Sequence, residues 1–86
     1  MRSFFYAPDP AIARVVSRQQ GWEQVHHSKW KLKTGEEVHL VNDWEALRGF
    51  RDCTLYVHPL QKVPPRVQQW LQAHNVAIRL LENPHV

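Results

Sequence analysis

The chain has 86 residues, of which 43% are hydrophobic and 22% are charged, a balance typical of a globular protein rather than a disordered one. This length fits one domain, predicted to span residues 1–86, and excludes most multi-domain enzymes. Eleven lysines and arginines against eight acidic residues give a formal net charge of +3. That charge permits binding to nucleic acid or to an acidic partner without requiring either.

Cysteine content and hydropathy predict the compartment. The single cysteine, Cys53, excludes an internal disulfide and a cysteine-based zinc site. The apolar run at residues 3–7 is shorter than the core of a signal peptide and ends at Pro8-Asp9. No window approaches the roughly 18 apolar residues of a membrane span. We therefore expect a cytoplasmic protein without a membrane segment, a cofactor or a bound metal.

The first quarter of the chain predicts a strand followed by a helix. Residues 3–7 are aromatic and small, as in strands, and the prolines after them end the strand. Asp9 has the chemistry of a helix N-cap, and Gly21 stands where a left-handed C-cap belongs. The predicted helix covers residues 10–20. Its apolar positions with helical spacing are Ile12, Val15 and Val16.

Residues 22–41 predict an antiparallel hairpin, because apolar and polar residues alternate on both arms. A two-residue loop would bring Trp30 opposite His39 and would mix the two faces. A three-residue loop, residues 34–36, pairs Trp30 with Leu40 and keeps the faces separate. In that loop Gly35 is second, whereas three-residue loops usually carry glycine third. The other pairs that this register predicts are Leu32 with Val38, Lys31 with His39 and Lys33 with Glu37.

The second half of the chain predicts two further helices and two strands. A capping box at residues 42–45, with Asn42 as the cap, opens a short helix that ends at Gly49. Pro64 opens a third helix with apolar residues at helical spacing. Residues 53–58 and 76–81 are rich in strand-forming side chains.

In chain order these elements read βαββαβαβ. The last two strands and the helix between them are expected to form a right-handed parallel crossover. The sequence therefore predicts an α/β (α+β) fold in one small domain. Its features are a five-stranded mixed sheet, a central antiparallel hairpin, a C-terminal parallel βαβ unit and three helices.

Basic side chains on the predicted hairpin are the first candidate site. Four of them share one face of the first arm and a fifth lies opposite: His27, Lys29, Lys31, Lys33 and His39. Such a row can neutralise several phosphates without reading base sequence, or can contact an acidic protein surface. Arg14 and Arg18, one helical turn apart, can grip phosphates in the same way. The alternative is a solvated sheet face, which hairpins commonly have.

Two other functions remain open at this point. An aromatic surface around Trp22 and the start of the chain would suit a homodimer or a structural or inhibitory protein contact. Asp9, Asp43 and His58 each follow a predicted strand, so their convergence would permit hydrolytic or metal-dependent chemistry. The chain lacks a glycine-rich phosphate loop and a nucleophile elbow. We therefore expect a non-catalytic binding module.

Overall fold

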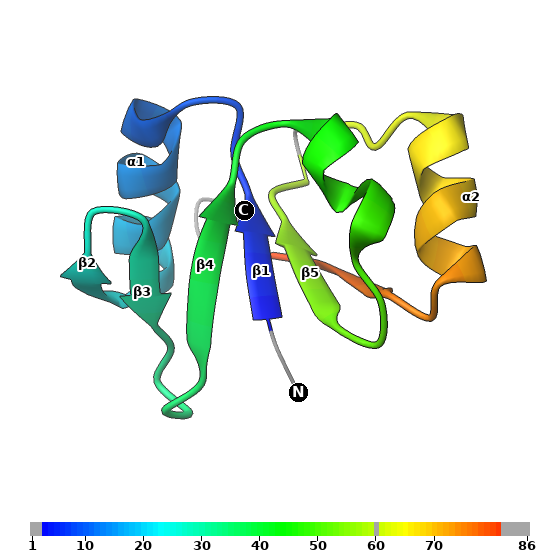
Figure 1. Cartoon of the computed structure of the whole chain (residues 1–86). Helices are drawn as coiled ribbons and strands as arrows, with labels where there is room; N and C mark the ends of the chain where they lie inside the picture. Colours follow the sequence, from blue (N-terminus) through cyan, green and yellow to red (C-terminus); the bar gives the residue numbers. More distant parts are fainter. Residues whose placement is uncertain (1–2, 60, 82–86) are drawn as a thin grey trace.

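The computed structural model describes residues 3–59 and 61–81 of the chain (Figure 1). In chain order the elements are β1 (Ser3–Tyr6), α1 (Pro10–Gln20), β2 (Glu23–His26), β3 (Lys29–Lys31), β4 (Glu37–Val41), the 3-10 helix η1 (Trp44–Gly49), β5 (Thr54–Val57), α2 (Pro65–Ala73) and β6 (Ala77–Leu80). The strands form one sheet in the order β2-β3-β4-β1-β5-β6. β1 pairs in parallel with β4 and β5, and β6 pairs in parallel with β5, whereas β3 is antiparallel to both its neighbours.

The mixed sheet is confirmed, but the prediction of five strands was wrong, because the first arm of the hairpin is itself two strands. β2 and β3 are antiparallel and are joined by a turn at residues 27–28. Clear alternation of apolar and polar residues starts only at Lys29. Before it, β2 carries one apolar residue, Val25, and all four residues of this strand are exposed. With no apolar face to bury, this segment folds back as an edge strand.

The predicted register between β3 and β4 was also wrong, by two residues. Trp30 pairs with Val38 rather than with Leu40. The bond from the Leu32 amide to the Glu36 carbonyl, 2.8 Å, closes a loop of residues 33–35 in which glycine is third. Gly35 has a φ of 91°, the left-handed conformation that this loop type needs at that position. A slip of two residues leaves every side chain on its predicted face, so the alternation could not detect the error.

Helix α1 has the predicted bounds and the predicted caps. The Asp9 carboxylate accepts hydrogen bonds from the amides of Ala11 and Ile12, and Gly21 ends the helix with a φ of 73°. The buried face differs from the expectation, however. It consists of Ala13, Val16 and Ser17, whereas Ile12 and Val15 are 37% and 57% exposed. The small side chains of Ala13 and Ser17 let the helix lie close to the sheet. Ile12 and Val15, on the neighbouring side of the helix, remain exposed to solvent.

The second predicted helix is a 3-10 helix, and its cap is Asp43 rather than Asn42. The Asp43 carboxylate accepts a hydrogen bond from the Glu45 amide. The carboxylate of Glu45 in turn lies 3.1 Å from the Arg66 guanidinium of α2 and 3.3 Å from that of Arg48. Both guanidinium groups lie over the Trp70 ring, at 4.7 Å for Arg48 and 5.5 Å for Arg66. This cluster fastens η1 to α2.

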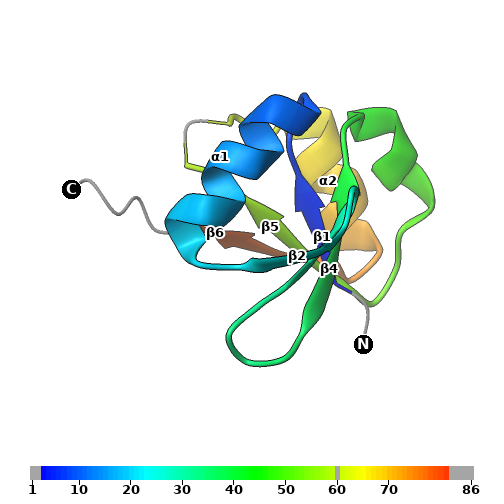
Figure 2. The ribbon, with the colours of Figure 1, turned by 90° about the vertical axis from the view of Figure 1, so that its left-hand side faces the viewer.

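The sheet separates two apolar clusters, with α1 on one face and with η1 and α2 on the other (Figure 2). On the α1 side, the fully buried residues include Phe5, Trp30 and Val38. On the other side they include Leu47, Leu55 and Leu71. None of the helices in the described ranges is long and apolar enough to cross a membrane.

Candidate functional site

The sheet face opposite α1 is left uncovered by helices where it is formed by β3 and β4 (Figure 1). Because Trp30 and Val38 point into the core beside α1, their neighbours point the other way. Lys29 lies opposite His39, and Lys31 lies opposite Glu37. We call the surface made by Lys29, Lys31, Glu37 and His39 the open face.

Carboxylates partly neutralise the lysines of the open face. The Lys29 ammonium lies 3.3 Å from a Glu37 carboxylate oxygen, and both side chains remain partly exposed. Lys31 has Glu37 opposite it on one side and Glu23 of β2 on the other. The open face is therefore less positive than the row of lysines in the sequence indicates. Exposed ion pairs of this kind contribute about 0–1 kcal/mol, so they remain exchangeable against another anion.

The other predicted basic residues lie elsewhere. The Lys33 side chain turns toward the end of α1, where its Cε lies 2.9 Å from the position that a Cβ on Gly21 would take. Arg14 and Arg18 are on α1 and thus on the opposite side of the sheet. His27 lies in the β2–β3 turn, with its ring centroid 4.1 Å from that of His26. Of the seven predicted residues, the structure brings Lys29, Lys31 and His39 together.

A line of rings continues the open face toward η1. The ring centroid of Phe4 on β1 lies 6.1 Å from that of His39 and 4.2 Å from that of Phe50. Phe4, Phe50 and Arg51 line a small cavity of about 260 Å³. We call His39, Phe4 and Phe50 the aromatic row. Lysines of the open face lie at one end of the aromatic row, and Arg51 lies at its other end.

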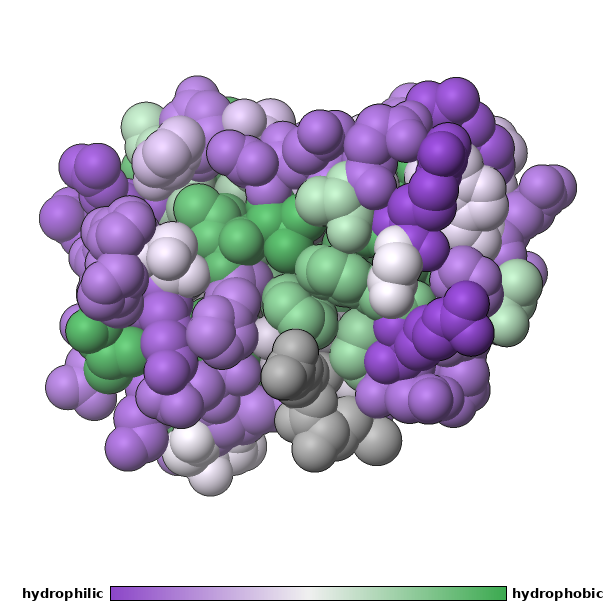
Figure 3. Space-filling view, viewed as in Figure 1, coloured by the Kyte–Doolittle hydropathy of each residue, from purple (hydrophilic) through white to green (hydrophobic). Residues whose placement is uncertain are grey.

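The surface colours agree with this arrangement. In Figure 3, hydrophilic residues dominate the left of the view, over β2 and β3, and hydrophobic residues gather in the middle, around β1. Phe4 and Phe50 are half-buried, and His39 is exposed. In the sequence, Phe4 stood out only as part of the aromatic start of the chain, and nothing singled out Phe50 or Arg51. Because side chains alternate along a strand, Phe4 and Phe5 point to opposite faces of the sheet. Only the parallel pairing of β1 with β4 places Phe4 beside His39.

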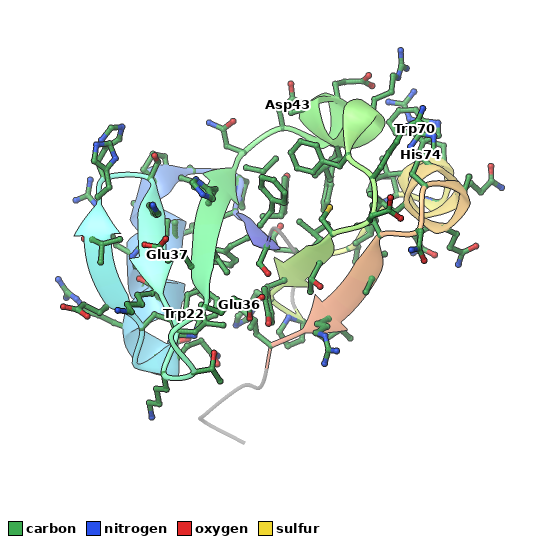
Figure 4. The ribbon with its side chains drawn as sticks, turned by 60° about the horizontal axis from the view of Figure 1, so that its bottom comes forward. Trp22, Glu36, Glu37, Asp43, Trp70 and His74 are labelled. Carbon is green, nitrogen blue, oxygen red and sulfur yellow. The ribbon has the colours of Figure 1, made fainter. Side chains whose placement is uncertain are left out.

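Of the three candidate residues at the carboxyl ends of the strands, the two aspartates cap helices. Asp9 caps α1. Asp43, which is labelled in Figure 4, caps η1. Burial and then the charge of Asp43 raise the pKa of Tyr6 above its usual value. His58 is 8% exposed. Within residues 3–59 and 61–81, no group of three or more histidine, cysteine or acidic side chains is placed to hold a metal ion.

The tryptophans and the cysteine are largely packed inside. Trp30 is buried, and the other three tryptophans are half-buried. Trp22 meets the ring of Phe5 edge-on, with centroids 5.2 Å apart. Cys53 is buried, and burial together with the Asp52 charge raises the pKa of its thiol. A protonated, enclosed thiol is a poor nucleophile.

A polar cluster at the other end of the sheet was not expected. Glu36, from the β3–β4 loop, accepts hydrogen bonds from the hydroxyl groups of Ser3 and Tyr56, the latter at 3.1 Å. Figure 4 shows Glu36 near Trp22 and away from Asp43. Burial raises the pKa of Tyr56, and so do its hydrogen bond to Glu36 and the negative charge of Glu36. The positive charge of Arg79 lowers this pKa. The cluster ties the loop to the sheet.

We expect Tyr56→Phe to lower the free energy of unfolding by about 1–2 kcal/mol at neutral pH, because the Glu36 carboxylate loses a donor. The folded-state pKa of Tyr56 lies above its ordinary value of about 10. The stabilisation is therefore complete below about pH 10 and is lost as the pH rises through the folded pKa. Urea titrations at neutral and alkaline pH should show the difference between wild type and variant shrinking. A difference that is constant with pH would contradict the coupling.

Comparison with protein-family models, with curated proteins and with solved structures finds no match for this chain.

Proposed function

We propose that this protein is a non-catalytic module that binds single-stranded nucleic acid across the open face and the aromatic row. The observation that carries the proposal is the line of three rings, His39, Phe4 and Phe50, with cations at both of its ends. Bases stack on such rings while lysine and arginine contact the phosphates on either side. The strand would run from Lys31 over Phe4 toward Arg51.

The chemistry favours single strands over duplexes and nucleic acid over an acidic protein. Bases inside a duplex are already stacked and cannot lie on Phe4. An acidic protein surface would engage Lys29 and Lys31 but would leave the aromatic row without a function. The ion pair of Lys29 with Glu37 limits the number of phosphate contacts to about two or three, so we expect modest affinity with a shallow salt dependence.

The test is a titration with labelled oligothymidylate and oligouridylate, followed by fluorescence anisotropy. Phe4→Leu keeps apolar volume in the core but removes the ring, and we expect a roughly 5- to 100-fold loss of affinity, the equivalent of one stacked base. Lys31→Glu should also weaken binding. Glu37→Gln should tighten binding up to about fivefold, because it frees Lys29 from an exposed ion pair.

Arg14→Glu is the matched control, because it changes the net charge as Lys31→Glu does but lies on α1, behind the sheet. We expect it to have a much smaller effect. Equal losses for Arg14→Glu and Lys31→Glu, together with no effect of Phe4→Leu, would exclude the open face as the site. Competition by poly-glutamate as strong as that by oligothymidylate would assign the surface to an acidic protein instead.

A further inference from the structure

Strand β6 forms one edge of the sheet, and its outer side is open in the described part of the chain. The amides of Ala77 and Leu81 donate to the carbonyls of Cys53 and Val57, both at 2.9 Å. Odd-numbered residues of β6 therefore point their backbone groups toward β5. Since these groups alternate along a strand, the amide and carbonyl of Ile78 and of Leu80 point outward. β6 thus offers four backbone groups to another strand.

The same two residues line an apolar groove beside this edge. Leu80 is 66% exposed, the largest exposed fraction among the exposed large hydrophobic residues of the described chain, and Ile78 is half-buried. The groove has a volume of about 740 Å³ and lies between β6 and the segment that leads into α2. Its other walls include Lys62, Val63, Pro64 and Gln68. We call it the edge groove.

The opposite edge of the sheet is built differently. β2 carries Glu23, Gln24 and His26, and its pairing with β3 shifts register between Gln24 and His26. Charges and a bulge are the usual means by which proteins prevent pairing at an exposed edge. β6 has neither a bulge nor a proline, and its one charged residue, Arg79, points to the face opposite the edge groove. β6 is therefore the edge that can accept a strand.

The charged residues near β6 indicate which kind of strand can pair with it. Among the described residues, Arg79 forms no ion pair, although it is exposed. Of the described residues that line the edge groove, Lys62 is the one that carries a charge. A second copy of this chain would fit poorly. If two β6 strands paired antiparallel through the amides and carbonyls of Ile78 and Leu80, Ile78 of one copy would lie opposite Leu80 of the other. Arg79 would then lie directly opposite Arg79 of the second copy. Like charges directly opposite one another are destabilising, whereas a carboxylate at that position is favourable.

We infer that β6 binds an extended segment of an acidic protein partner, which adds to the sheet beside Ile78 and Leu80. The segment has the pattern apolar, acidic, apolar. Its apolar side chains lie on the groove side next to Leu80, and its carboxylate lies on the other face next to Arg79. In such complexes the backbone hydrogen bonds give affinity and the alternating side chains give selectivity. This surface is separate from the open face.

The experiment uses two blocked peptides with the central sequences Val-Glu-Val and Val-Lys-Val, titrated into the protein and followed by amide chemical shifts. We expect the glutamate peptide to bind about two- to fivefold more tightly, from one cross-strand charge pair. Arg79→Glu should invert this preference. Leu80→Lys should weaken both peptides, and Val25→Lys, the matched change on β2, should weaken neither.

Several results would overturn the inference. They are an absence of shifts at Ile78 and Leu80 at millimolar peptide, an unchanged preference in Arg79→Glu, or equal effects of Leu80→Lys and Val25→Lys. Sedimentation of the protein alone as a dimer that Leu80→Lys dissociates would assign the edge to a second copy. Phe4→Leu should leave peptide binding unchanged, so failure here and failure of the nucleic-acid proposal are distinguishable.

Discussion

Replacing Trp30 with alanine is expected to lower the free energy of unfolding by about 3–5 kcal/mol. The side chain is 1% exposed and meets the Phe5 ring edge-on, with centroids 6.1 Å apart. An 86-residue domain at about 0.05–0.15 kcal/mol per residue has a total stability of roughly 4–13 kcal/mol. The variant should thus lose a quarter or more of its stability, and a urea titration followed by circular dichroism would measure the loss.

The control is Lys31→Ala, one residue along the same strand but on the open face. Exposed substitutions of this kind stay within about 0.5 kcal/mol of wild type. Equal destabilisation by the two variants would contradict the assignment of alternate residues of β3 to core and solvent. That assignment also underlies the proposed nucleic-acid surface, since it decides which way the lysines point.

Replacing Leu47 with alanine is expected to cost about 2–5 kcal/mol and also to weaken nucleic-acid binding. Short 3-10 helices have little stability of their own, so tertiary contacts must hold η1 in place. Leu47 is completely buried among side chains of the core under α2, and its carbonyl accepts a hydrogen bond from the Phe50 amide. Loosening η1 would therefore displace Phe50, the end of the aromatic row.

Arg48→Ala is the comparison for this variant. It removes an exposed contact with Glu45 and another with the Trp70 ring, which together are worth about 0.5–2 kcal/mol. Urea titration and oligothymidylate binding of both variants, at a temperature where each is folded, separate the two effects. Stability loss in Leu47→Ala with unchanged binding would show that Phe50 does not contribute to the site.

Much of the fold followed from local signals in the sequence. Asp9 and Gly21 set the ends of α1 because a side-chain cap and a left-handed residue act over one turn of chain. Alternation around Trp30 and Val38 decided which side chains enter the core. Gly35 also carried the correct register, since a three-residue loop with glycine third requires the observed pairing.

The candidate site depended on contacts between distant segments, and those could not be read from the sequence. Phe4 lies beside His39 only because β1 inserts in parallel next to β4. Lys33 leaves the basic row because the loop register carries it toward Gly21. Caps, turns and periodicity are properties of neighbouring residues, so the sequence by itself determined α1 and the faces of β3 and β4. The pairing of remote strands is decided by how their side chains pack together, and this alone placed the aromatic row and left β6 at an edge.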